Sequence, residues 1–148
     1  MVAYTDASSK GLGVWFVGEH VGYQCPLPPN APKDAIFYFE ALAVCSAILL
    51  SRSFQKTSHL IVYTDSTNTF DIFTSLAAKP VYNKIFICSI DMLLEDELDL
   101  RVFHIPGHKN LIADPLSRYK NRLATTLSPG PIIGTFTPPQ DVMGALKK

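Results

Sequence analysis

Three short runs dominated by strand-forming residues open the chain. Residues 2–5, 11–18 and 21–26 are rich in β-branched and aromatic side chains, and only short turns separate them. This spacing predicts three consecutive strands in an antiparallel meander. Gly11 and Gly13 lie at the start of the second run, where a missing side chain permits unusual backbone angles or close approach by a ligand.

A long apolar run follows a proline-rich loop. Residues 34–53 are hydrophobic at nearly every position, which predicts a helix that is buried over most of its surface. Glu40 interrupts this run, although its neighbours three and four positions away on both sides are all apolar. A carboxylate on such a face is costly unless a cation pairs with it or a proton neutralises it. The pattern favours a functional role over a glutamate that reaches out at the helix edge.

Strand and helix patterns alternate in the second half of the chain. Residues 59–65 and 100–105 are predicted strands, and residues 66–76 and 81–97 are predicted helices between them. Strands that alternate with helices predict parallel pairing, so we expect an α/β fold.

The last part of the chain has a different composition. Residues 123–148 contain four prolines and three glycines and show no clean period. Such a composition is typical of an extended tail or linker. The sequence therefore predicts one domain over residues 1–120 and a Pro/Gly-rich tail over residues 121–148.

Composition narrows the possible classes of protein. The chain has 148 residues, of which 47% are hydrophobic, so it can bury a core and is not disordered overall. Its formal net charge is zero, so nucleic-acid binding would depend on a local basic patch or on metal ions. Three widely spaced cysteines lack zinc-ligand spacing and indicate a reduced compartment. We expect no membrane segment, because no apolar run is long enough and no leader pattern is present.

Two stretches of the chain are near copies of each other. Residues 61–67 (Ile-Val-Tyr-Thr-Asp-Ser-Thr) repeat the pattern of residues 2–8 (Val-Ala-Tyr-Thr-Asp-Ala-Ser). If the two are neighbouring parallel strands, Asp6 and Asp65 emerge side by side and repel each other unless a cation lies between them. The alternative is that both are ordinary Asx turns at strand ends.

Four acidic residues stand out along the chain. They are Asp6, Glu40, Asp65 and Asp114. Asp114 lies at the start of a predicted helix, so the alternative to a functional role is that Asp114 and Pro115 simply cap this helix. Carboxylates without cationic partners suit the hard divalent ions Mg²⁺ and Mn²⁺. Two such ions about 3.5–4 Å apart can carry out in-line phosphoryl displacement.

These acids lie in four short stretches whose order is informative. The most specific is PGHKNLIADPLSR at residues 106–118, because such a run is hard to obtain by chance. The other three stretches are Thr5-Asp6-Ala7-Ser8 with Gly11-Leu12-Gly13, Phe39-Glu40-Ala41-Leu42-Ala43, and Tyr63-Thr64-Asp65-Ser66. With these four stretches in this order, residues 1–120 resemble the ribonuclease H domains fused to retrotransposon reverse transcriptases.

The resemblance implies a ribonuclease H-like fold with a five-stranded mixed sheet, three strands antiparallel and two added parallel, flanked by helices. It implies that Asp6, Glu40, Asp65 and Asp114 hold two Mg²⁺ or Mn²⁺ ions. The implied reaction is hydrolysis of the RNA strand of RNA–DNA hybrids during reverse transcription of a retroelement. The implied partner is the reverse transcriptase domain of the same polyprotein, inside the cell, in a cytoplasmic or nuclear retroelement particle.

Other polar residues near the acids are candidates for substrate contacts, although each also suits a turn or a helix cap. His108 lies in the loop where cellular relatives carry a mobile histidine that assists proton transfer or product release, and a plain surface histidine is the alternative. The candidates for sugar and phosphate contacts are Ser8, Ser66, Thr67, Asn68 and Lys109.

Two other functions compete with an active nuclease. One is a catalytically idle domain that positions a reverse transcriptase on its template, which would not need Glu40 on an apolar face. The other is a transposase or integrase, in which the glutamate comes late in the chain rather than second. Some cellular relatives carry a basic helix and loop that binds the hybrid, whereas residues 76–84 here contain only two lysines. We therefore expect weak hybrid binding by this domain alone.

Overall fold

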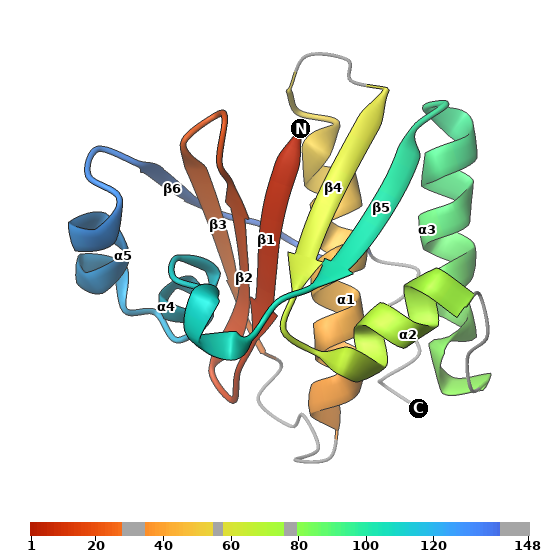
Figure 1. The fold of residues 1–148 in the computed structure, drawn as a ribbon, viewed down its shortest axis with the longest axis horizontal. Coiled ribbons are helices and arrows are strands. Elements are labelled where there is room, and N and C mark those ends of the chain that lie inside the picture. The colour runs from red at the N-terminus through yellow and green to blue at the C-terminus, as the bar shows by residue number, and fades with distance from the viewer. Residues whose placement is uncertain (28–34, 55–57, 76–79, 140–148) are drawn as a thin grey trace.

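A six-stranded mixed sheet forms the centre of the molecule (Figure 1). The computed structural model describes residues 1–27, 35–54, 58–75 and 80–139, and within them the strand order is β5-β4-β1-β2-β3-β6. The strands are β1 (Val2–Ala7), β2 (Gly11–Phe16), β3 (Val21–Pro26), β4 (His59–Thr64), β5 (Asp99–His104) and β6 (Ile132–Thr135).

The pairing confirms the predicted meander and the predicted parallel strands. β1 pairs antiparallel with β2 and β2 with β3, whereas β4 runs parallel to both β1 and β5. The first five strands therefore have the predicted arrangement, and β6 is an additional strand. The helices are α1 (Ile36–Ser51), α2 (Thr67–Ser75), α3 (Asn83–Glu95), α4 (Ala113–Ser117) and α5 (Asn121–Leu127), with short 3₁₀ turns η2 (Pro80–Tyr82) and η3 (Gly107–Lys109).

The helices cover the two faces of the sheet unequally. α1 packs on β1, β2 and β4, and α3 packs on α1, which makes one face a helical layer. α4 lies over β1, β2 and β3 on the opposite face, to one side of β4 and β5 (Figure 1). Most of α1 is buried, as its apolar run predicted, while its expected start at residue 34 lies outside the described residues. In the described part of the chain, no helix has the length and apolar character that crossing a membrane requires.

The segment after residue 120 differs from the extended tail that its composition predicted. It forms α5 and then β6, which pairs in parallel with β3. Ile133 packs against a small cluster formed by Trp15, Leu116 and Ala124, so apolar contacts hold the strand on the sheet. A strand of four residues is too short to show a clear alternation of apolar and polar positions, so the sequence did not predict β6. The division into residues 1–120 and 121–148 stays a prediction, and residues 140–148 lie outside the description.

Candidate metal centre

Three carboxylates from distant parts of the chain meet at the carboxyl ends of the central parallel strands. Tyr4 of β1 is paired with Tyr63 of β4, so Asp6 and Asp65, two residues further on, emerge at the same level. Glu40 reaches them from α1, which packs on β1. One carboxylate oxygen of each of the three acids lies within 4.8 Å of the other two. The juxtaposition that the near copies predicted is therefore present.

Two of these acids are deeply buried. Asp6 is 3% exposed and lies within β1 rather than in a turn. Glu40 is 7% exposed, so it does not reach out to solvent at the helix edge. Its Oε2 atom is buried and has no hydrogen-bond partner among the described residues. A buried carboxylate oxygen without a partner is costly and fits a site that receives a cation.

Burial and mutual repulsion disfavour ionisation of the cluster. Burial raises the pKa of Glu40 from 4.5 to about 9, and the charges of Asp6 and Asp65 add to this, against a hydrogen bond from the Ala7 backbone. Burial also raises the pKa of Asp6 from 3.8 to about 7, although a hydrogen bond from Ser117 lowers it. The pKa of Asp65 is raised mainly by burial. A divalent cation would remove this repulsion, and oxygen-only ligands suit Mg²⁺ or Mn²⁺.

Asp114, the fourth predicted acid, lies beside this group but is not part of it. It occupies the first turn of α4, whose N-cap is Ile112, so the alternative of an Asp-Pro helix cap is wrong. Its Oδ1 accepts a hydrogen bond of 3.0 Å from Nε of Arg118, and its side chain is 42% exposed. A side-chain hydrogen bond also joins it to Asp6, and its charge contributes to the raised pKa values of Asp6, Glu40 and Asp65. The structure thus brings three of the four acids into one group and places the fourth beside Asp6, where it also pairs with an arginine.

A glycine allows α4 to lie against the strand that carries Asp6. Gly13 is paired with Asp6 across β1 and β2, and a Cβ atom there would lie 2.5 Å from the carbonyl oxygen of Ala113. It would also lie 2.7 Å from the backbone nitrogen of Ser117. The close approach that the sequence allowed at Gly13 is therefore made by the chain's own helix.

Ser117 is a site residue that the sequence analysis did not single out. Its Oγ donates a 2.7 Å hydrogen bond to Oδ2 of Asp6, and it is fully buried. The hydroxyl of Ser8 donates a 2.8 Å bond to the carbonyl oxygen of Ser117. The signal for Ser117 was its place in the run at residues 106–118, but no local pattern indicates that it contacts a residue 111 positions away.

Asn110 is a second such residue. Its Nδ2 donates a 2.8 Å hydrogen bond to the carbonyl oxygen of Thr5, and its side chain lowers the pKa of Asp65 by hydrogen bonding. Its Oδ1 is buried without a partner among the described residues. Asn110 therefore fastens the loop after β5 to β1 beside the carboxylates.

The candidates for substrate contacts occupy different environments. Ser8 is buried and also accepts a bond from the backbone of Lys10, and Ser66 accepts one from the backbone of Thr69 as an α2 cap. Asn68 donates a 3.2 Å bond to the hydroxyl of Tyr82, and Thr67 is exposed. Their roles in substrate binding stay predictions.

His108 and Lys109 are exposed in η3, next to the carboxylates. A Cβ atom at Gly107 would lie 3.5 Å from Oδ2 of Asp65, so this turn lies directly beside that acid. The turn that carries both residues therefore borders the site, and both are accessible from solvent.

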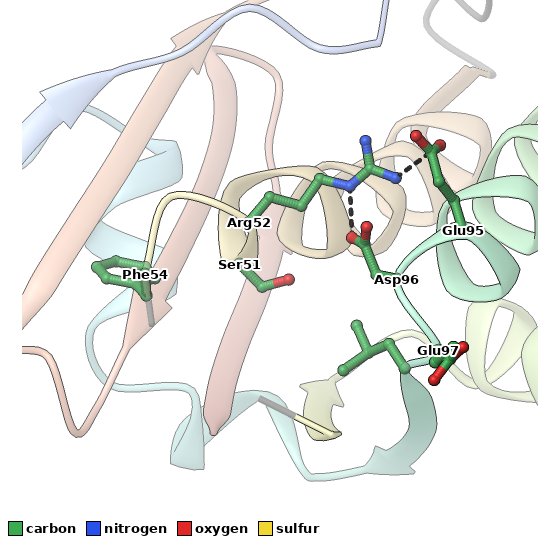
Figure 2. Close-up of a pocket in the computed structure, with 7 residues that line it drawn as sticks. Ser51, Arg52, Phe54, Glu95, Asp96 and Glu97 are labelled. Atoms are coloured by element: carbon green, nitrogen blue, oxygen red, sulfur yellow. Dashed lines mark hydrogen bonds and ion pairs between the residues drawn. The ribbon is translucent and has the colours of Figure 1, made fainter. Parts of the chain in front are cut away.

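A hollow of about 330 Å³ lies away from the carboxylates, where α1 and α3 end (Figure 2). Arg52 lines it and donates to Asp96 at 2.7 Å and to Glu95 at 3.2 Å. Glu95 and Asp96 therefore form ion pairs with Arg52 at the end of α3. The hollow offers no chemistry comparable to the carboxylate cluster.

The strand order, the helical layer and the acidic site define an α/β protein of the ribonuclease H-like fold. LC11-RNase H1 in complex with an RNA/DNA hybrid matches with a TM-score of 0.63 and 20% identity, over 78% of this chain and 91% of that chain. RNase H1 from the archaeon Halobacterium salinarum NRC-1 matches with a TM-score of 0.64 and 16% identity, over 82% and 96%. An N-terminal RNase H domain from Mycobacterium tuberculosis matches with a TM-score of 0.59 and 13% identity, over 86% and 97%.

At these identities the likeness shows the fold alone. No protein-family pattern matches the sequence, and no curated protein matches it.

Proposed function

We propose that this protein is a ribonuclease H, a divalent-metal-dependent endonuclease that hydrolyses the RNA strand of an RNA–DNA hybrid. The observation that carries the proposal is the buried cluster of Asp6, Glu40 and Asp65, with an unpartnered Glu40 oxygen, at the strand ends of a ribonuclease H-like fold. The hybrid bound to LC11-RNase H1 supports the substrate class.

The proposal assigns a role to each acid. Asp6, Glu40 and Asp65 would hold two Mg²⁺ or Mn²⁺ ions, and Asp114, which is hydrogen-bonded to Asp6, would join them. The ions bound there would supply an activated water and would neutralise the charge that develops on the leaving 3′ oxygen. The cleaved RNA then carries a 5′ phosphate and a 3′ hydroxyl.

The residues around the acids orient them and handle protons. The hydroxyl of Ser117 holds Oδ2 of Asp6 and so fixes the rotation of that carboxylate. Asn110 keeps the loop after β5 on β1. To His108, which is exposed in the turn beside Asp65, we assign the transfer of a proton between the site and solvent.

The proposal extends to the biological setting. We assign the activity to reverse transcription of a retroelement, with the reverse transcriptase domain of the same polyprotein as the partner. This assignment is supported by the run at residues 106–118, which resembles that of retroelement ribonuclease H domains. The location inside the cell, in a cytoplasmic or nuclear retroelement particle, belongs to the same proposal.

A cleavage assay tests the nuclease. An end-labelled RNA–DNA hybrid is incubated with the protein in Mg²⁺ or in chelator, beside Asp65→Asn and the control Asp91→Asn, which changes an exposed acid on α3. We expect RNA cleavage in Mg²⁺ only, abolished in Asp65→Asn and retained in Asp91→Asn. Intact RNA in every lane would overturn the proposal.

One observation favours a second candidate, the catalytically idle domain that positions a reverse transcriptase. The ion pair with Arg118 engages an oxygen of Asp114, the fourth acid, which does not belong to the three-acid cluster. Such a domain would bind a hybrid without cutting it, so the same assay combined with a binding measurement separates the two functions.

A further inference from the structure

Three aromatic side chains form a continuous row across the sheet. Tyr4 of β1, Tyr63 of β4 and Phe103 of β5 are paired in register on adjacent strands. The rings of Tyr4 and Tyr63 are stacked, with centroids 4.9 Å apart and planes at 21°. The ring of Phe103 follows 5.9 Å from Tyr63, tilted by 33°. The stack therefore ends at Phe103, on a strand at the edge of the sheet.

The row lies on the face of the sheet that the helical layer does not cover. The residues that alternate with the rings, Ala3 and Val62 among them, are buried in the core on the α1 side. In Figure 1 this open face of β1, β4 and β5 is turned toward the viewer, with α1 behind the sheet and α4 to one side. Phe103 is 44% exposed, so the last ring of the row is accessible from solvent.

The row is continuous with the candidate metal centre. Asp6 lies two residues after Tyr4, and Asp65 lies two residues after Tyr63. Because side chains two residues apart on a strand point to the same face, each ring is the neighbour of a carboxylate along its strand. A molecule bound at the carboxylates and extending over the open face of the sheet would therefore meet the rings next.

A basic side chain lies beside Phe103 on this face. It belongs to residues 100–127, which contain five basic residues and a single acid, Asp114, while β5 itself begins with a further acid, Asp99. Arg101 precedes Phe103 by two residues on β5, so it lies on the same face, and its side chain is 71% exposed. Its contact with Asp99 is 3.7 Å long and exposed, which leaves the guanidinium accessible. The other four basic residues are Lys109, Arg118, Lys120 and Arg122.

Aromatic rings beside basic side chains recognise unpaired nucleotides. Bases within a duplex stack on one another, whereas an unpaired base can stack on a protein ring, and nearby Arg or Lys side chains neutralise its phosphate. We propose that the Phe103 end of the row binds a single-stranded stretch that continues from the hybrid, with Arg101 at its phosphate. The proposal rests on the proposed function for the hybrid, but the single strand is a ligand of its own.

Binding measurements in chelator test this site without cleavage. Fluorescence anisotropy compares a blunt RNA–DNA hybrid, the same hybrid with a short uridine overhang, and a free uridine oligonucleotide. Phe103→Leu removes the ring and keeps an apolar side chain, Phe103→Tyr keeps the ring, and Ile132→Leu is a control at an exposed position on the opposite edge strand. We expect Phe103→Leu to weaken overhang and oligonucleotide binding about tenfold and to leave blunt-hybrid binding unchanged. Phe103→Tyr and Ile132→Leu should bind like the parent protein.

Photo-crosslinking gives a direct readout. An overhang that carries 5-iodouridine should form an adduct at Phe103 or Tyr63, and mapping of the adduct elsewhere would overturn the proposal. Equal affinities of Phe103→Leu and the parent protein would also overturn it, and would suggest that the row serves a protein partner. Equal loss for blunt and overhanging hybrids would show that Phe103 only supports the sheet. If the protein binds the overhang but does not cleave RNA, the single-strand site stands and the proposed nuclease function is wrong. If it cleaves RNA but does not bind the overhang, the nuclease function stands and the single-strand site is wrong.

Discussion

The carboxyl group of Glu40 dominates the electrostatics of the site. In the unfolded chain it titrates near its ordinary pKa of 4.5, whereas burial raises this pKa to about 9 in the folded protein. Between those values the folded state holds one more proton than the unfolded state, so the free energy of unfolding of the metal-free protein falls as pH rises. The raised pKa of Asp6, about 7, contributes to this decrease in the free energy of unfolding only below pH 7.

Glu40→Gln should therefore stabilise the metal-free protein and flatten its pH dependence. We expect a gain of roughly 2 kcal/mol or more at pH 8, with most of the fall between pH 7 and pH 9 abolished. Urea unfolding in chelator at several pH values measures this. A parent protein whose stability is constant over that range would show that Glu40 is not held protonated.

Ser117→Ala should weaken metal binding. The substitution removes the hydroxyl that orients Asp6, and loss of a residue that supports a metal ligand commonly costs about tenfold or more in metal affinity. The Mg²⁺ concentration for half-maximal activity measures the effect, and manganese calorimetry without substrate provides a second readout. Thr125→Ala, which removes an exposed hydroxyl on α5, is the control. Unchanged metal affinity in Ser117→Ala would contradict this positioning role.

Arg118→Gln should strengthen metal binding. The exposed pair between Arg118 and Asp114 is worth less than about 1 kcal/mol, so a metal ion can displace the arginine with little loss. Removal of the arginine should lower the manganese dissociation constant by up to about fivefold. Calorimetry measures this beside Arg122→Gln, an exposed arginine on α5. Weaker binding in Arg118→Gln would show that the arginine helps to hold Asp114 in place for the metal.

Helix α4 depends on the glycine beneath it. The two helix atoms nearest to a Cβ at Gly13, from Ala113 and Ser117, are backbone atoms that a side-chain rotation cannot move. Gly13→Ala should therefore displace α4, destabilise the protein by about 1–3 kcal/mol and impair metal binding through Ser117. Thermal unfolding measures the first effect. Gly18→Ala is the matched control, because a Cβ there meets nothing within 4 Å. Equal stability of the two variants would contradict the tight packing at Gly13.

At the level of the whole molecule, charge limits substrate binding. The formal net charge is zero, and residues 100–127 hold five of the thirteen Lys and Arg residues. We expect the isolated protein to bind a blunt hybrid weakly at physiological salt, with an affinity that falls steeply as salt rises. Anisotropy titrations over a salt series measure this. Tight binding at physiological salt would contradict the expectation and remove the need for a partner domain.

Local patterns determined the elements and the identities of the acids. Strand-forming runs and helical apolar runs report which faces are buried, so the meander, the parallel strands, α1 and α3 were predicted from neighbours in sequence. Glu40 stood out for the same reason, because a charge among apolar neighbours is visible without a structure. The repeated Tyr-Thr-Asp pattern indicated that Asp6 and Asp65 lie together.

Only the tertiary structure decided how those acids are held. The bond from Ser117 to Asp6, the bond from Asn110 to Thr5 and the pairing of β6 with β3 join segments about a hundred residues apart. The engagement of Asp114 by Arg118 is local in sequence, yet its consequence depends on where α4 lies relative to β1. Burial and distance set these contacts, and both arise when separate segments pack, so no local pattern contains them.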